Sequence, residues 1–279
     1  MKEITTPALP GASEYPNATE LLMQRFRIAP DHIAFEVRSS QSSITDPWRG
    51  VSTSEFVAEV RALAKGLIAA GLEPGETLAI MSPTRYEWAL MDMAAWFASA
   101  VVVPIYETSA LNQVTAILQD ASVRFAVAGT AEHAQLLEQG FMHTGVSGWQ
   151  LWTMDAGSGP ALKELIHGGV DITLEALEDR RLLATLDSVA TIVYTSGTTA
   201  SPKGALITHG NFVGQVLSVA GAYTEVVKES GNTIIFLPMA HVLARGLQLI
   251  CLANGMHIAH LSETKEIVPA LGVAVVPEV

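Results

Sequence analysis

The chain has 279 residues, of which 49% are hydrophobic and 16% are charged, so it can bury a sizeable core. Its formal net charge of −12 argues against a nucleic-acid partner and against a polybasic membrane-binding patch. The longest apolar stretch, residues 94–106, is shorter than the roughly 20 residues that span a bilayer. Cys251 is the single cysteine, which excludes an internal disulfide and suits the reducing cytoplasm.

The N-terminal residues 1–16 are rich in proline, glycine and serine, and we expect them to be irregular. The clearest helix is predicted over 52–71. Ser52 and Glu55 have the spacing of a capping box, and apolar residues recur at helical spacing after them. Gly71 is suited to the helix end.

Strands and helices are predicted to alternate through the first two thirds of the chain. The expected strands are 31–38, 77–81, 101–106, 124–128 and 149–154. The expected helices are 19–26, 52–71, 85–98, 109–120, 131–139 and 173–183, with Thr173 as the cap of the last. Such alternation predicts an α/β fold with largely parallel sheets flanked by helices in βαβ units.

A short apolar strand at 190–194 leads into a loop of hydroxyl groups and glycines that ends at Lys203 and Gly204. After the loop we expect a strand at 205–207, a helix from Thr208 to about residue 222, a strand at 233–237, a helix within 238–253 and a strand at 256–260. These segments continue the same α/β pattern.

The loop at 195–204, T-S-G-T-T-A-S-P-K-G, has the chemistry of a phosphate site. Its glycines let a phosphate approach the backbone N–H groups, and Lys203 supplies a compact positive charge. It differs from the common G-x-x-x-x-G-K-[ST] loop, and Pro202 removes one backbone donor. From composition alone, an ordinary surface loop between two strands is an equal alternative.

The order of residues in this loop resembles the signature of the adenylate-forming superfamily, which includes acyl-CoA synthetases, peptide-synthetase adenylation domains and luciferases. The resemblance extends to residues 98–105 and 237–245, and the A-H-V-x-x-R form of the latter is similar to the long-chain fatty acid branch. It implies that His241 borders the acyl pocket. It also implies that the ATP phosphates are bound by Thr195, Ser196, Gly197, Thr198, Thr199, Lys203 and Gly204.

The implied activity is that of a fatty acid–CoA ligase with two half-reactions. A fatty acid carboxylate attacks the α-phosphate of ATP and releases pyrophosphate, and coenzyme A then attacks the acyl-adenylate to form a thioester and release AMP. Magnesium accompanies ATP, and no protein nucleophile is needed, because positioning and electrostatic stabilisation carry the phosphoryl chemistry. No residue is therefore assigned as a catalytic group. A cytoplasmic location is expected, and a lipid substrate is compatible with peripheral contact with a membrane.

The resemblance covers only the N-terminal portion of such enzymes. Residues 17–279 are expected to form an incomplete AMP-binding domain without the C-terminal lid and its catalytic lysine. The adenine- and magnesium-binding Y-G-x-T-E segment and a ribose-binding aspartate do not occur. Two alternatives remain: a catalytically inactive fragment with weak phosphate binding, and an adenylating enzyme for an aryl or amino acid. Sheet edges and apolar faces are expected to be left exposed.

Other candidate residues are assigned structural roles. His257 and His260 are three residues apart on a predicted strand, so they face opposite sides and make a poor pair of metal ligands. Cys251 lies in an apolar run and is expected to be a buried thiol. Arg245 is expected to form a structural salt bridge.

Overall fold

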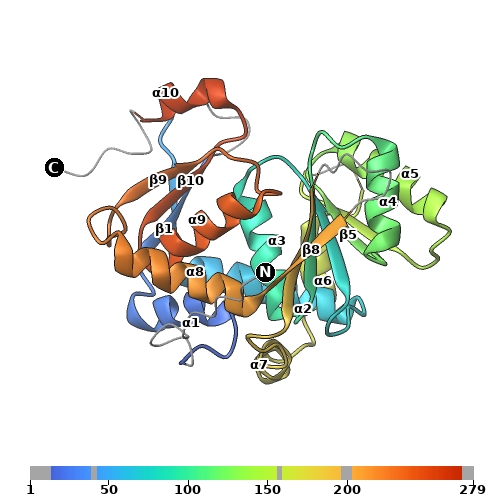
Figure 1. Ribbon diagram of the computed structural model, residues 1–279, viewed down its shortest axis with the longest axis horizontal. Helices are drawn as coiled ribbons and strands as arrows, with labels where there is room; N and C mark the ends of the chain where they lie inside the picture. The colour runs from blue at the N-terminus through green and yellow to red at the C-terminus, as the bar shows by residue number, and fades with distance from the viewer. Residues whose placement is uncertain (1–13, 39–42, 156–158, 196–202, 272–279) are drawn as a thin grey trace, which may run out of the picture.

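The computed structural model describes residues 14–38, 43–155, 159–195 and 203–271. Two sheets with helices between and beside them make up this part of the chain (Figure 1). The expected α/β architecture, largely parallel and flanked by helices, is confirmed.

The larger sheet has six strands in the order β6-β5-β3-β4-β7-β8. All neighbouring pairs are parallel except β7 and β8, which form an antiparallel hairpin. Its strands are β3 (Thr77–Met81), β4 (Val101–Ile105), β5 (Phe125–Ala128), β6 (Gln150–Thr153), β7 (Val189–Thr195) and β8 (Lys203–Thr208).

The smaller sheet has four strands in the order β2-β1-β10-β9. Only β2 is antiparallel to its neighbour. The strands are β1 (Ile33–Val37), β2 (Arg49–Ser52), β9 (Asn232–Ile235) and β10 (His257–His260).

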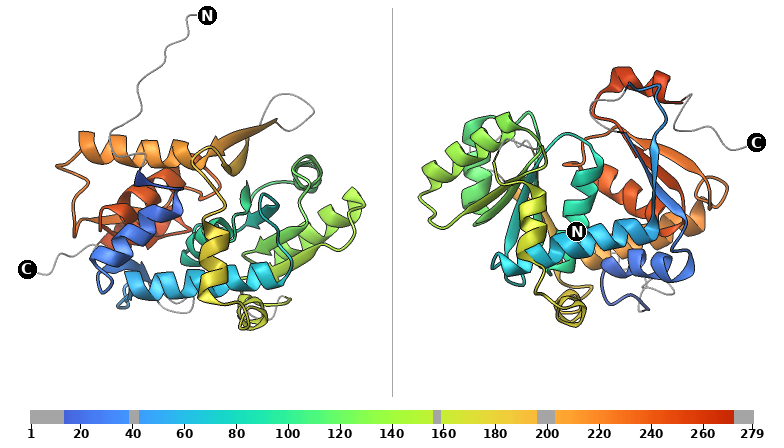
Figure 2. Two further views of the ribbon diagram at one scale, coloured as in Figure 1. Left: turned by 90° about the horizontal axis from the view of Figure 1, so that it is seen from below. Right: turned by 180° about the vertical axis from the view of Figure 1, so that it is seen from behind.

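The described helices differ in the side of the sheets that they cover. They are α1 (Thr19–Ile28), α2 (Thr53–Ala69), α3 (Tyr86–Phe97), α4 (Leu111–Asp120), α5 (Ala131–Thr144), α6 (Leu162–Gly168), α7 (Leu174–Arg181), α8 (His209–Ala222), α9 (Val242–Ala253) and α10 (Ile267–Leu271). One core cluster joins the two sheets through α1, α2, α3, α8 and α9. A second lies beneath α4 and α5 on the outer face of the larger sheet (Figure 2).

The central strands of the larger sheet are apolar on both faces. In β3, Leu78 and Ile80 belong to the core between the sheets, whereas Ala79 and Met81 lie beneath α4 and α5. A parallel strand covered by helices on both sides needs apolar residues at every position, which is why residues 77–81 show no alternation.

Several local predictions are confirmed. In α2, the Ser52 hydroxyl accepts from the Glu55 N–H at 3.2 Å, and the Glu55 carboxylate accepts from the Ser52 N–H at 2.7 Å. Thr173 and Thr208 cap α7 and α8. The strand predicted over 77–81 is β3 itself.

The prediction of a helix that ends at residue 139 was wrong, because α5 continues to Thr144. Gly140 does not interrupt it, since this residue lets α5 approach α4 closely: an added Cβ would lie 2.9 Å from Leu118 Cδ1. The helix ends instead at Gly145, whose φ of 71° suits glycine.

Two short elements were not predicted. The strand β2, just before α2, exists through its antiparallel pairing with β1. The helix α6 is held against α2 at Gly66, where an added Cβ would lie 2.2 Å from the Leu165 carbonyl oxygen. Both depend on contacts with segments that are distant in the sequence.

The residues assigned structural roles lie as expected. The His257 ring is 3.8 Å from the Glu36 carboxylate, whereas the His260 ring stacks on Phe35 on the other face of the sheet. Cys251 is buried, and burial raises the pKa of its thiol to about 12. Within the described residues, no helix is long and apolar enough to cross a membrane.

Buried His209, at the start of α8, makes stability depend on pH. Burial and the nearby Arg245 charge lower the pKa of His209 to about 4. As the pH falls below about 6.5, the unfolded chain binds a proton before the folded chain does. We expect the free energy of unfolding to fall by up to about 1.4 kcal/mol per pH unit from this residue between about pH 6 and 4.

Urea unfolding at a series of pH values measures this effect. His209→Gln should reduce the slope, whereas His143→Gln, at an exposed position, should leave it unchanged. Equal slopes in the wild-type and His209→Gln proteins would contradict the prediction.

Candidate nucleotide site at the carboxyl ends of the two sheets

The β7–β8 hairpin positions the two ends of the predicted phosphate loop. Thr195 at the end of β7 pairs with Lys203 at the start of β8, and Tyr194 pairs with Gly204. The side chain of Lys203 is exposed. Ser196, Gly197, Thr198 and Thr199 lie outside the described residues. The hairpin therefore brings Thr195 and Lys203 together but leaves the other predicted contacts as predictions.

Gly204 is required by close packing within the hairpin. A Cβ at this position would lie 2.5 Å from Ile192 Cγ2 and 3.1 Å from Tyr194 Cζ on the neighbouring strand. Any larger residue would push β8 away from β7. The glycine that follows the lysine thus has a structural reason, beside the phosphate contact that the resemblance implies.

The hairpin is attached to α4 through Tyr194. The Tyr194 hydroxyl donates to the Asp120 carboxylate at 2.5 Å, at the last residue of α4. Burial and this carboxylate raise the pKa of Tyr194 well above its usual value. The phenol therefore stays protonated and fixes the end of β7 beside α4.

His241 caps α9. Its ring Nδ1 accepts a hydrogen bond from the Leu243 N–H at 3.2 Å, and the backbone N–H of His241 donates to the Pro238 carbonyl at 2.9 Å. The side chain is exposed. In a neutral ring with an accepting Nδ1, the proton is on Nε2, which is then a donor. The sequence did not reveal this capping role, because histidine is not among the preferred cap residues.

Thr84 joins the carboxyl ends of the two sheets. Its hydroxyl donates to the Leu237 carbonyl at 2.8 Å and accepts from the Met239 N–H at 3.2 Å. Thr84 follows β3 of the larger sheet, and Leu237 follows β9 of the smaller sheet. Because ligands of parallel α/β sheets bind outside the carboxyl ends of the strands, this shared edge is the candidate site.

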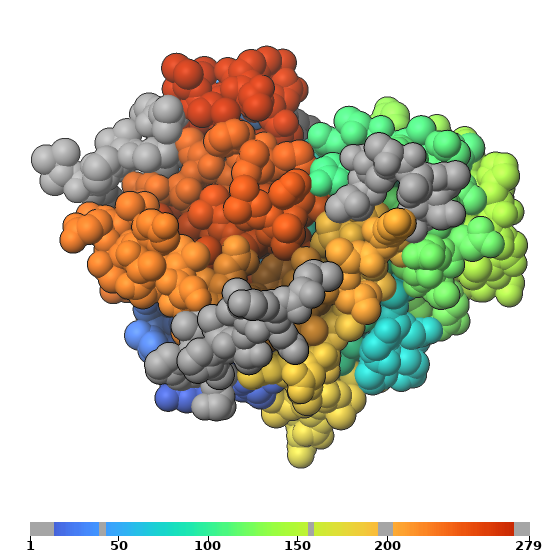
Figure 3. Space-filling view, in the orientation of Figure 1, coloured from blue at the N-terminus to red at the C-terminus, as the bar shows by residue number. Residues whose placement is uncertain are grey.

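A polar cleft of about 730 Å³ opens at the same edge, beyond β1, β3 and β10. Its charged lining contains both signs: Arg38, Arg49, Arg85, Glu87, Glu263 and Glu266. Figure 3 shows β9 to α10, in orange and red, beside α4 and α5, in green, on one face of the molecule.

A buried ion pair joins α3 and α9. The Arg245 guanidinium of α9 binds the Asp92 carboxylate of α3 in a fork, at 3.0 Å and 2.5 Å, and donates to the Thr191 hydroxyl of β7 at 2.6 Å. The expected structural role of Arg245 is thereby confirmed. Asp92 was missed, although an acidic residue in the apolar run 88–97 is a signal for a buried partner.

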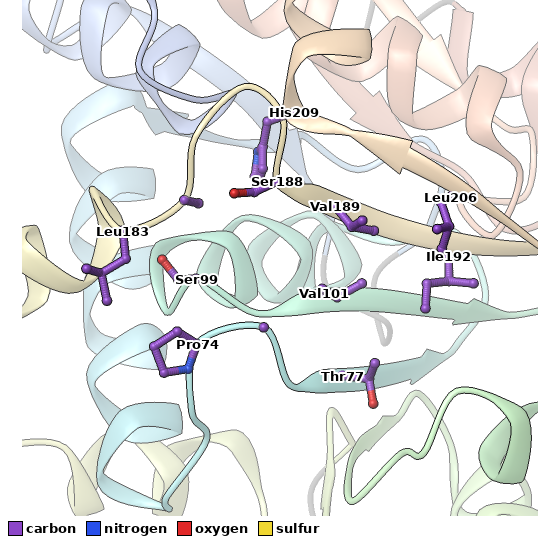
Figure 4. A pocket seen from close by; sticks show the side chains of 12 residues that line it. Pro74, Thr77, Ser99, Val101, Leu183, Ser188, Val189, Ile192, Leu206 and His209 are labelled. Carbon is purple, nitrogen blue, oxygen red and sulfur yellow. The ribbon is translucent and has the colours of Figure 1, made fainter.

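A second pocket, of about 480 Å³, lies away from the candidate site (Figure 4). Thr77, Val101 and Val189 line it at the amino ends of β3, β4 and β7, whereas the phosphate loop follows the carboxyl end of β7. Leu206 of β8 borders it and is 64% exposed.

The fold and the hairpin define an adenylate-forming domain. The sequence profile of the AMP-binding enzyme family matches residues 24–276, so the chain belongs to this family. It is 33% identical over 274 residues to long-chain-fatty-acid–CoA ligase FadD15 of Mycobacterium tuberculosis, covering 98% of this chain and 44% of that protein. It is 27% identical to human long-chain-fatty-acid–CoA ligase 1, over 76% of this chain and 32% of that protein.

Solved structures share the fold. A long-chain-fatty-acid-CoA ligase (FadD1) from Archaeoglobus fulgidus matches 96% of this chain and 52% of its own, with 20% identity and a TM-score of 0.75. O-succinylbenzoate coenzyme A synthetase from Bacillus subtilis, solved with ATP and magnesium, matches 92% of this chain and 61% of its own, with 21% identity and a TM-score of 0.72. The chain spans 44% of FadD15 and 32% of the human ligase, which is less than half of either curated relative.

Close packing at Gly204 gives a testable prediction. Gly204→Ala should destabilise the protein by about 1–3 kcal/mol, the usual cost of inserting a methyl group into a packed site. Urea unfolding measures the change. Gly214→Ala in α8 is the matched control, because no atom lies within 4 Å of its added Cβ, and it should be neutral or stabilising. Equal effects at the two positions would contradict the prediction.

Proposed function

We propose that this chain is the nucleotide-binding portion of a fatty acid–CoA ligase that activates a long-chain fatty acid with ATP, first as acyl-adenylate and then as acyl-CoA. The observation that carries the proposal is the T-S-G-T-T-x-x-P-K-G hairpin at the carboxyl edge of an adenylate-forming fold. A curated relative that is 33% identical to this chain is named a long-chain-fatty-acid–CoA ligase. A cytoplasmic location with peripheral contact with a membrane would suit a lipid substrate.

In this proposal the hairpin binds the phosphate tail of ATP. Lys203 is exposed and free to place its ammonium group against phosphate oxygens, and Gly204 presents no side chain in their way. Thr195, Ser196, Gly197, Thr198 and Thr199 complete the phosphate contacts through hydroxyl and backbone N–H groups. The proposed AMP-binding domain consists of residues 17–279, and residues 1–16 form a separate N-terminal segment.

Magnesium would arrive bound to the phosphates. No group of three or more histidine, cysteine, aspartate or glutamate side chains in the described ranges could hold a metal ion. Magnesium in nucleotide sites is commonly held by one or two carboxylates together with the phosphates, so it does not require such a cluster. The described residues contribute phosphate binding, and coenzyme A would act as the second substrate.

His241 is proposed to lie against the carboxylate end of the acyl substrate. Its ring is held by the first turn of α9, and a protonated Nε2 could donate to a carboxylate oxygen. The A-H-V-x-x-R segment around it supports a long-chain acid. An aryl acid is the rival, since the synthetase from Bacillus subtilis named for O-succinylbenzoate has the same fold.

Binding of ATP tests the phosphate site in the 279-residue chain. Titration calorimetry with MgATP should show binding that Lys203→Ala weakens roughly 10- to 100-fold, because a charge-assisted hydrogen bond contributes about 1.5–3 kcal/mol. Lys228→Ala, at another exposed lysine, should bind as the wild type does. Equal affinity of the Lys203→Ala and Lys228→Ala variants for MgATP would show that Lys203 does not bind the phosphates.

ATP–pyrophosphate exchange tests the activity and the substrate. The 279-residue chain should show no palmitate-dependent exchange above the Lys203→Ala level, because the adenine, ribose and magnesium groups that the resemblance implies do not occur in it. A longer form with these groups should use palmitate better than acetate or benzoate. A preference for benzoate would favour the aryl acid alternative, and exchange by the 279-residue chain would refute the first expectation.

A further inference from the structure

Arg245 is surrounded completely by other groups, and each part of its side chain has a partner. The residue is 0% exposed. Its guanidinium binds both oxygens of Asp92 and the hydroxyl of Thr191. The centroids of three aromatic rings lie 5.3–5.6 Å from Arg245 Cζ: those of Trp88, Trp96 and Phe212. Arg245 thus brings α3, β7, α8 and α9 together at one point.

Arg245 is linked to both segments of the candidate site, the β7–β8 hairpin and the start of α9. Thr191 lies four residues before Thr195, on the strand that carries the phosphate loop. His241 lies four residues before Arg245, at the cap of α9. The Thr191 hydroxyl also donates to the Val102 carbonyl of β4 at 2.6 Å, so the link continues into the centre of the larger sheet.

A buried ion pair of this kind is a weak source of net stability, because desolvation of both charges offsets their attraction. Apolar side chains of similar volume often hold a core together as well or better. The planar fork of an arginine does supply direction, since binding a carboxylate in one plane fixes where its other N–H groups point. Here Nη1 donates to Thr191 of β7.

We propose that Arg245 is a positioning residue: its fork on Asp92 and its bond to Thr191 fix the orientation of α9, and with it His241, relative to the β7–β8 hairpin. The consequence for acyl-adenylate formation rests on the function proposed above. The geometric claim does not, so it can be tested without ATP or a fatty acid.

Pulsed electron paramagnetic resonance measures the distance between the two segments directly. Spin labels are placed on Leu206→Cys in β8 and Leu243→Cys in the first turn of α9, which are 64% and 54% exposed. The buried Cys251 is changed to alanine. With Arg245 in place, we expect a single narrow distance distribution.

Arg245→Met with Asp92→Val removes both charges together, so no buried charge is left unpaired. We expect this pair of changes to broaden the distribution or displace its maximum, measured under conditions where the protein stays folded. Thr191→Val removes only the hydroxyl and should produce a smaller change in the same direction. If the double variant fails to fold, Thr191→Val decides the outcome.

Arg181→Met is the control, because Arg181 is another buried arginine with carboxylate partners, and its bonds to Glu20 and Glu178 join α1 and α7 and not the two labelled segments. It should lower stability and leave the distribution unchanged. A narrow, unshifted distribution in Thr191→Val, or equal broadening in Arg181→Met, would overturn the proposal. Failure of the chain to bind ATP would refute the proposed function and leave this result untouched.

Discussion

The guanidinium of Arg245, which has no exposed surface, imposes the strictest constraint on how this chain folds. A charge in such a position is tolerated only when every donor and its counter-ion are satisfied. Asp92 supplies the counter-ion, Thr191 takes the remaining described hydrogen bond, and aromatic faces surround the cation. Loss of one partner of a buried pair typically costs about 3–5 kcal/mol. The helices between the sheets therefore have one compatible arrangement around it.

This arrangement also explains why the candidate site lies where it does. The pair ties β7 to α9, and Thr84 ties the end of β3 to the end of β9. Together these contacts hold the carboxyl edges of two separate sheets side by side. The β7–β8 hairpin belongs to the larger sheet, and the His241 segment follows β9 of the smaller sheet.

The chemistry proposed for this edge does not require a nucleophile or an acid–base group from any single side chain. Adenylate formation proceeds by holding the phosphates and the carboxylate in place, and the protein contributes N–H groups, hydroxyls and one ammonium group. Leu206 of the hairpin is 64% exposed. The chain spans 44% of a relative such as FadD15.

The sequence by itself determined the α/β class, the boundaries of β3, the capping box of α2 and the family, since these depend on local patterns and on one continuous string at 195–204. It could not determine β2 or α6, which exist only through pairing with β1 and contact at Gly66. The sequence suggested His241 as a site residue but not its role as the cap of α9. It suggested a salt bridge for Arg245 but not its partner, Asp92. Asp92, Thr191 and Arg245 are separated by up to 153 positions, and only the tertiary structure brings them together. Pairing of buried charges is a three-dimensional requirement, which a pattern read along one chain does not contain.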